Sequence, residues 1–300
     1  MNKSLNPVDA AAVRVAGVSA SEKLAALRRR AWPGLRLILA VAIVAAVLLP
    51  VAYMLAMSVR PAADIMAKPL ALPASLYWDN YGNTFGQMNY WRSVANTIGI
   101  TVAVTLLVSL VSSMAAYPLA RLRGKAVAVL YMLLTLGLMV PMFVGLTPLY
   151  LLLRDLGLLN SYAGIVLAYT ALNLPLGVFF YASFLKSIPA ELEEAAVLDG
   201  CNGWQVYWHV ILPLLRPITG TLAMFVTLHV WNDLVYPLLF LSDESKFPIT
   251  VSVFRFIGTQ DIDPTKLFPA AVLATLPLLA MFFVLQRQIV AGITAGAVKG

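Results

Sequence analysis

The sequence predicts an all-α, polytopic membrane protein with six transmembrane helices and a cytoplasmic helical loop. Hydrophobic residues make up 61% of its 300 residues and charged residues only 12%, whereas soluble domains carry about 25% charged residues. The mean hydropathy is +0.84. Six long segments are poor in charge, and a polar stretch between the fourth and fifth has the pattern of two short helices. Lipid is therefore the expected surrounding of most of the chain.

The N-terminal region is mixed and polar, and it has no early apolar core followed by a small-residue cleavage site, as a signal peptide would. Ser19–Arg30 has the pattern of an amphipathic basic helix, in which Ser19 and Glu22 fit a capping box and arginines would face anionic headgroups. A partly disordered tail is the alternative. The predicted domains are a cytoplasmic tail at 1–34, a six-helix transmembrane domain at 35–290 and a cytoplasmic tail at 291–300.

Six segments are long enough to span a membrane, since a helix needs about 20 apolar residues to cross a hydrocarbon core of about 30 Å. In order they are Leu37–Val59, Ser93–Ala120, Ala126–Leu153, Leu156–Leu185, Ile218–Leu241 and Leu267–Leu285. Pro50, Pro141 and Pro175 lie inside spans, and each removes a backbone hydrogen bond, so we expect kinks there.

The distribution of basic residues predicts the orientation. With the N-terminus inside, fourteen Lys and Arg residues fall in inside segments and seven in outside segments. Basic residues favour the cytoplasmic side, so both termini are expected there. The net charge of +7 is read through this topology and not as a sign of nucleic-acid binding. The loop 186–217 is net acidic, so its inside position depends on the number of spans before it and on its motif.

The two long outside loops differ in character. The first, 60–92, is aromatic, with Tyr77, Trp78, Tyr81, Tyr90 and Trp91. An aromatic belt at the membrane–water interface is a simpler interpretation of these residues than stacking on a sugar. The second, 242–266, is polar and would face a soluble partner.

The inside loop 186–217 reads as two short helices joined by a tight turn. Pro189 suits a first helical turn, and the glutamates after it favour the positive end of a helix. Gly200 permits the left-handed conformation that ends a helix. A second helix, which Pro213 would stop, carries an apolar stripe. The stripe consists of Trp204, Tyr207, Trp208 and Ile211. Such an element suits transmission of force, and a hairpin that merely lies on the membrane is the alternative.

Fixed spacings in this loop carry a family resemblance. The pattern is Glu194-Ala195-Ala196, then Gly200, then Leu212-Pro213. The segment LKSIPAELEEAAVLDGCNGWQVYWHVILPLLRP resembles the EAA coupling loop of carbohydrate ABC importer permeases, and it is similar to that of the second permease subunit of the maltose importer. NSYAGIVLAY and WNDLVYPLLFL resemble the fourth and fifth spans of this family, and GITAGAVKG resembles the tail of its sugar branch. The resemblance covers residues 35–300. Cys201 and Val210 depart from it by small apolar changes.

The resemblance implies a type I ABC importer fold and a set of partners. Glu194, Ala195, Ala196, Asp199 and Gly200 would insert into a cleft of an ATPase subunit, where Glu194 and Asp199 would meet basic groups or cap local backbone. A purely structural, turn-capping role is the alternative for Asp199. The full importer would have a second permease, two ATPase subunits holding ATP and Mg, and a soluble sugar-binding protein. It would sit in the bacterial inner membrane and take up a di- or oligosaccharide, with glycerol-3-phosphate and other polyol-like solutes left open.

Polar side chains inside spans are candidates for a translocation pathway, because they are costly in lipid. Asn173, Asn232 and Asp233 are the main ones, and Asn96 and Thr97 are also weighed. Asn173 lies near Pro175, so bonding to a freed carbonyl is an equal alternative for it. In the family, the better-defined sugar site can lie mainly on the partner permease.

Other function classes are less well supported. The chain has no Gly-x-x-x-x-Gly-Lys-Ser/Thr phosphate loop, so ATP hydrolysis would come from a partner and the chain itself would need no cofactor. An ion-coupled carrier is the main alternative, but only Asp233 is charged within the spans. A membrane enzyme is weaker, because His209 and His229 form no metal-ligand pattern and no metal site is expected. The lone Cys201 excludes an internal disulfide.

Overall fold

The computed structural model describes residues 36–141, 143–257 and 263–297, with side chains up to Phe283 in the last helix. The predicted helix Ser19–Arg30 and the end of the C-terminal tail lie outside these residues. The chain divides into two units, Met1–Ala56 and Met57–Gly300. The first unit contributes most of an apolar helix, Arg36–Ser58, whose 23 residues are long enough to cross a bilayer.

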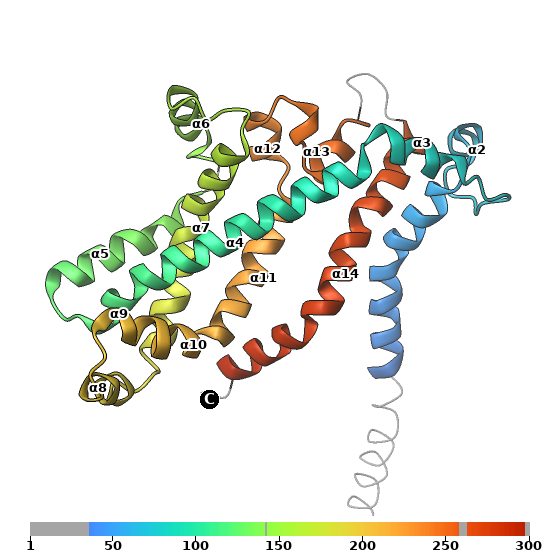
Figure 1. Cartoon of the computed structure of the whole chain (residues 1–300). Coiled ribbons are helices and arrows are strands. Elements are labelled where there is room, and N and C mark those ends of the chain that lie inside the picture. Colours follow the sequence, from blue (N-terminus) through green and yellow to red (C-terminus); the bar gives the residue numbers. More distant parts are fainter. Residues whose placement is uncertain (1–35, 142, 258–262, 298–300) are drawn as a thin grey trace, which may run out of the picture. The chain divides into compact units, whose positions relative to one another are not determined.

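The all-α fold class is confirmed for the described residues, and three further helices match predicted spans. They are α4 (Tyr90–Arg121), α7 (Tyr162–Leu185) and α14 (Pro264–Ala297) (Figure 1). The helix α14 continues twelve residues past the predicted end at Leu285, into the segment predicted as a tail. At 1.5 Å per residue its 34 residues extend about 51 Å, which exceeds a hydrocarbon core.

The fourth span begins six residues later than predicted, at Tyr162 instead of Leu156. Gly157 and Asn160 adopt positive φ angles of 67° and 54°, which no helix accommodates. Ser161 then caps α7, because its hydroxyl accepts a hydrogen bond of 3.0 Å from the backbone N–H of Gly164. The connection before α7 is therefore a structured turn.

The predicted third span, Ala126–Leu153, is wrong as a single helix. The structure has α5 (Lys125–Leu136), a 3₁₀ turn (Gly137–Met139) and α6 (Leu146–Asp155). Pro141 lacks the N–H that would continue the helix, and it breaks the segment instead of kinking it. Lys125–Met139 is 15 residues, about 22 Å of helix, which is shorter than a bilayer core.

The predicted fifth span, Ile218–Leu241, is also interrupted. The helix α11 (Arg216–Asn232) ends at Asp233, whose ψ of 134° is extended, and α12 (Val235–Phe240) follows. The carboxylate of Asp233 accepts hydrogen bonds from the N–H groups of Val235 (3.0 Å) and Tyr236 (3.2 Å). Asp233 thus supplies an N-terminal cap for α12 in the middle of an apolar run.

Short helices cluster on the predicted outside loops: α2 (Ala62–Ala67), α3 (Asp79–Gln87), a 3₁₀ turn (Glu244–Lys246) and α13 (Ile249–Phe254). Arg60 organises the first loop, with only 2% of its surface exposed. Its guanidinium donates to the carbonyls of Asp64 (2.7 Å), Lys68 (3.0 Å) and Ala71 (3.0 Å). Arg60, one of the seven basic residues assigned to outside segments, is therefore a buried residue that holds this loop together through its hydrogen bonds.

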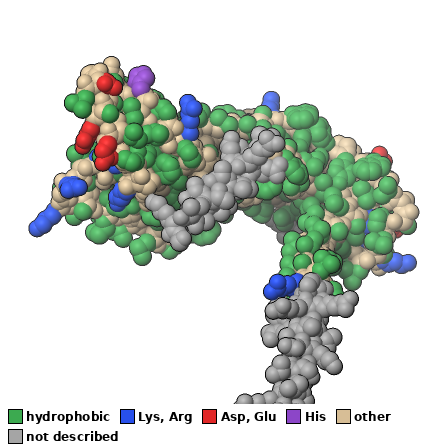
Figure 2. All heavy atoms as spheres, turned by 90° about the horizontal axis from the view of Figure 1, so that it is seen from below, with side chains coloured by type: hydrophobic (Ala, Val, Ile, Leu, Met, Phe, Trp, Pro, Cys, Tyr) green, Lys and Arg blue, Asp and Glu red, His purple; other side chains and the backbone are tan. Residues whose placement is uncertain are grey.

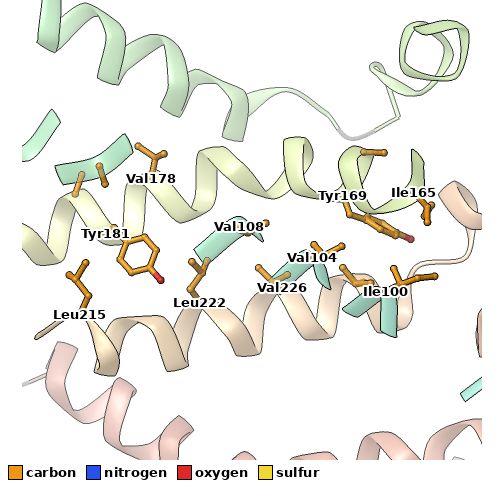
Figure 3. Packing of buried hydrophobic residues seen from close by; sticks show 14 of the residues in the cluster. Ile100, Val104, Val108, Ile165, Tyr169, Val178, Tyr181, Leu215, Leu222 and Val226 are labelled. Atoms are coloured by element: carbon orange, nitrogen blue, oxygen red, sulfur yellow. The ribbon is translucent and has the colours of Figure 1, made fainter. Parts of the chain in front are cut away.

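The main core lies where α4, α7 and α11 pack together. The side chains of Val104, Val108, Val178, Tyr181 and Leu222 are fully buried. Figure 3 shows Val104, Val108, Tyr181 and Leu222 between α7 and α11, and Val178 on the other side of α7. Gly177 of α7 lies directly against Ser112 of α4. Small residues at such a crossing let two membrane helices approach closely. The inner surface of this core continues into the loop between α7 and α11.

Candidate functional site

The first helix of the loop, α8 (Glu191–Leu198), forms as its sequence predicts. Three glutamates occupy its first turn, where the positive end of the helix dipole favours them. The helix ends at Leu198, and Gly200 in the turn after it has a φ of +88°, in the left-handed region. The N–H of Cys201 bonds the carbonyl of Ala196 at 3.0 Å, which closes the turn.

The second helix is less regular than predicted. It consists of α9 (Gly203–Val206), a π-helical stretch (Tyr207–Ile211) and α10 (Leu212–Leu214). Asn202 and Gln205 form a capping box, which the sequence reading missed although both residue types are typical of one.

The predicted stop at Pro213 is displaced by one residue, because the helical segment runs to Leu214 and then bends by 70° into α11. Pro213 has no N–H for the carbonyl four residues before it, and a wider π turn precedes it. The loop therefore connects to α11 through a corner.

One face of α8 is exposed. Glu194, Ala195, Asp199 and Gly200 are exposed and Ala196 is half-buried, so the structure brings the first five predicted site residues onto one surface. Among the described residues, the carboxylates of Glu194 and Asp199 have no hydrogen bond or ion pair. The turn-capping alternative for Asp199 therefore has no bond to support it. In Figure 2, acidic side chains gather at the left of a mainly hydrophobic face.

The opposite face of α8 is anchored to α4. Glu193 forms an ion pair with Arg121 at 2.6 Å and accepts a hydrogen bond of 2.9 Å from the hydroxyl of Tyr117. Arg121 also donates to the carbonyl of Ile188 at 3.1 Å. From the sequence, Glu193 is predicted only as one of the glutamates at the start of a helix. Its pairing with Arg121 is not predicted, because spacings of three or four residues indicate partners on the same helix and not on another one.

A second anchor lies under the second helix. The hydroxyls of Tyr207 and Ser113 are 2.8 Å apart, and the Tyr207 ring stacks on Trp204 with centroids 6.1 Å apart. Tyr207 belongs to the predicted apolar stripe and is buried, whereas Trp204 is 60% exposed. The stripe is therefore only partly a packing face.

Leu212 and Pro213, the last two residues of the predicted pattern, are half-buried and belong to α10, not to α8. They line an open hollow of about 360 Å³ together with Trp208, Arg216 and Thr219. Their place in the loop is at the corner between its second helix and α11.

Two of the three predicted pathway residues, Asn173 and Asp233, belong to one polar group between α7 and α11. The Asn173 amide donates to the carbonyl of Tyr169 (2.7 Å), and its oxygen lies 2.9 Å from Nδ1 of His229. The Tyr169 hydroxyl donates to Asp233 (2.7 Å). Asn173 thus bonds a carbonyl, but not that of residue 171, which Pro175 frees. Asn232 is exposed and donates to the carbonyl of Leu228 (2.8 Å).

The described residues form an all-helical membrane fold with a helical loop attached to α4, which is the architecture expected of a polytopic permease subunit. The chain belongs to the family of binding-protein-dependent transport system inner membrane components, whose model matches residues 109–295, more than half of the chain.

Similar proteins agree with this family. The diacetylchitobiose uptake system permease protein NgcG of Streptomyces coelicolor is 31% identical over 84% of each chain. The melibiose/raffinose/stachyose import permease protein MelC of Bacillus subtilis is 33% identical over 88% of this chain and 95% of its own. A solved chain of a bacterial ABC transporter that imports the acidic polysaccharide alginate is 25% identical, with a TM-score of 0.75 over 86% of this chain and 96% of that one. The ion-coupled alternative is not supported.

Proposed function

We propose that this chain is one of two permease subunits of an ATP-driven sugar importer and that its loop 186–217 transmits the work of separate ATPase subunits. One observation carries the proposal: α8 presents Glu194, Ala195, Asp199 and Gly200 to solvent while its opposite face is held on α4 by Arg121. A surface that is exposed on one side and fixed on the other suits the docking of a motor. A hairpin lying loosely on a membrane would need no such anchor.

The proposed substrate is a di- or oligosaccharide. The support comes from the relatives, whose names specify diacetylchitobiose, the melibiose–raffinose–stachyose group and starch degradation products. These sugars differ in linkage and size, so the substrate class is proposed and not a particular sugar.

The proposed partners follow from the exposed surface and from the sequence. The ATPase subunits would bind ATP and Mg, since the chain has no phosphate-binding loop of its own. Basic groups of an ATPase cleft would pair with Glu194 and Asp199, which have no ion pair within the described residues. Leu212 and Pro213 would border this contact at the corner into α11. A second permease and an extracytoplasmic sugar-binding protein would complete the importer, with both termini of this chain cytoplasmic.

For the translocation pathway, we propose different roles for the three candidate residues. Asn232 is exposed and would touch the sugar. Asn173 is 3% exposed and Asp233 caps α12, so these two would shape the wall formed by α7 and α11. Polar groups this costly to place in a membrane are retained where they line or support a pathway.

Proteoliposomes test the proposal. The chain is co-expressed with the permease, ATPase and binding protein encoded beside it, and ATP hydrolysis is measured with a panel of di- and oligosaccharides. Glu194→Ala and Gly200→Pro are compared with Glu191→Ala, which changes an exposed glutamate on the same helix outside the proposed contact. Proline cannot adopt the φ of +88° at position 200.

We expect one sugar to stimulate hydrolysis in the wild type and in Glu191→Ala, and both loop changes to abolish this stimulation while the chain still inserts. Transport without any ATPase partner, or two silent loop changes, would overturn the proposal.

A further inference from the structure

The loop 186–217 makes its side-chain hydrogen bonds to the membrane helices selectively. Three of these bonds are local and join residues no more than four positions apart: Ser187 donates to the end of α7, and Thr219 and Thr221 of α11 donate to the carbonyls of Leu215 and Pro217. Every other such bond among the described residues reaches α4. The four bonds come from Arg121 to Glu193, Tyr117 to Glu193, Arg121 to the Ile188 carbonyl, and Ser113 to Tyr207. In sequence, α4 is distant from this loop, whereas α7 and α11 are its direct neighbours.

The contact between Arg121 and Glu193 has the geometry of a firm attachment. Their side chains are 20% and 14% exposed, and Nε and Nη2 of Arg121 both approach one carboxylate oxygen, at 2.7 Å and 2.6 Å. Arg121 is in the last turn of α4, where the negative end of the helix dipole favours a cation. Glu193 is in the first turn of α8, where the positive end favours an anion. A half-buried, hydrogen-bonded pair is stronger than a surface pair.

The other end of α4 is attached in the same way to an outer segment, Ser245–Ser252. Asn96 donates to the carbonyls of Ser245 (2.9 Å) and Phe247 (3.1 Å). The hydroxyl of Thr97 accepts from the Ile249 N–H at 2.9 Å, and the hydroxyls of Ser93 and Ser252 lie 2.8 Å apart. Polar bonds therefore fix α4 at both ends.

Between its ends, α4 is one continuous helix, and several of its buried hydroxyls have no hydrogen-bond partner among the described residues. It is one helix of 32 residues, about 48 Å long. The buried hydroxyls of Thr101, Thr105 and Ser112 have no hydrogen-bond partner among the described residues. By contrast, α11 is bent by 70° where it leaves the loop and is interrupted at Asp233, so it is poorly suited to carry a displacement.

We propose that α4 is the element that carries displacement of the coupling loop to the outer segment Ser245–Ser252, with the Arg121–Glu193 pair as its inner attachment and Asn96 as its outer one. Glu193, Arg121 and Asn96 are thus positioning residues for transport. The inference rests on the proposed function, because an ATPase must move the loop. It identifies a route that the order of helices along the chain does not suggest.

The test follows the outer segment directly and needs no sugar. Val253 of α13 is half-buried beside this segment, so Val253→Cys is combined with Cys201→Ala as the parent chain. The complete complex in nanodiscs is treated with ATP and vanadate, and the labelling rate of Cys at 253 is measured with a membrane-impermeant maleimide. Glu193→Gln, Asn96→Ala, the double variant and the matched control Glu191→Gln are made in the parent.

We expect ATP and vanadate to change the labelling rate of the parent and of Glu191→Gln by about fivefold or more, the lower end of the range for coupled sites. Glu193→Gln and Asn96→Ala should each remove most of this change while ATP hydrolysis continues. The double variant should be no worse than either single one, because both break the same linear connection. Arg121→Lys should retain part of the response, since it keeps the charge.

The outcomes separate the two proposals. A parent complex that hydrolyses no ATP would contradict the proposed function. A parent complex that hydrolyses ATP without any change of the labelling rate at residue 253 would overturn the role of α4. A responsive parent with a Glu193→Gln variant that behaves like Glu191→Gln would overturn the role of α4 alone. Independent, multiplying effects of Glu193→Gln and Asn96→Ala would also overturn it.

Discussion

Gly177→Ala is expected to disturb the packing of α4 against α7. A Cβ added at residue 177 would lie 2.7 Å from the Cβ of Ser112 and 3.3 Å from Cγ1 of Val108. Ordinary contact begins at 3.4 Å, so the two helices must separate by about 0.7 Å near this point. The Ser112 hydroxyl can rotate away, but its Cβ is fixed to the backbone of α4. The strain therefore falls on the helix pair itself.

The size of the effect follows from two opposing contributions. Overpacking a tight interior costs about 1–3 kcal/mol, whereas replacing glycine by alanine inside a helix gains up to about 1 kcal/mol. Gly99→Ala is the matched control, because Gly99 also lies in a membrane helix and a Cβ there meets nothing within 4 Å. The difference between the two variants should therefore be about 1–3 kcal/mol, with Gly177→Ala the less stable.

Thermal unfolding in detergent, followed by the fraction of monodisperse protein, measures this difference. Ser112→Gly should restore most of the stability lost in Gly177→Ala, because it removes the opposing Cβ, and a double-mutant cycle isolates that coupling. Equal midpoints for Gly177→Ala and Gly99→Ala, or no coupling to Ser112→Gly, would refute the argument that this crossing is limited by backbone approach.

Three further changes test local features. Arg60→Met keeps most of the side-chain volume but donates no hydrogen bond to a carbonyl, so limited proteolysis should cut the segment 61–72 several times faster. An unchanged rate of cutting would show that the bonds of Arg60 do not hold this loop. Asn202→Ala should cost about 1 kcal/mol of local stability and speed hydrogen exchange at 203–206, whereas Asn202→Ser should not. Asp233→Ala should destabilise the chain by about 1–3 kcal/mol through the lost cap and the unpaired hydroxyl of Tyr169, with thermal unfolding as the measurement and Asn232→Ala as the milder control.

Apolar runs predicted the membrane class and most helices, because hydrophobic length is what a bilayer selects. They failed at the interruptions of two spans. Residues 126–153 and 218–241 carry no charged side chain apart from Asp233 and are apolar on average, so their mean hydropathy does not reveal a boundary at Pro141 or Asp233. The boundaries are set by backbone hydrogen bonding, a missing donor at Pro141 and a capping carboxylate at Asp233.

The loop was predicted better in its local structure than in its attachments. The helix end just before Gly200 follows from one residue type and was correct. The pairing of Glu193 with Arg121 joins residues 72 positions apart, and nothing in local spacing indicates it. The roles of Glu194, Asp199 and the other contact residues stay predictions, because their proposed partners are other chains.

The exposed apolar side chains of α8 have a consequence for the assembly of the complex in the cell. Leu198 is 88% exposed and Val197 57% exposed, on a helix that the proposed topology places in the cytosol. Apolar surface of this kind is a recognition signal for chaperones and proteases, which remove proteins that display it. An orphan copy of this chain would therefore be short-lived, and docking of an ATPase subunit would hide the signal.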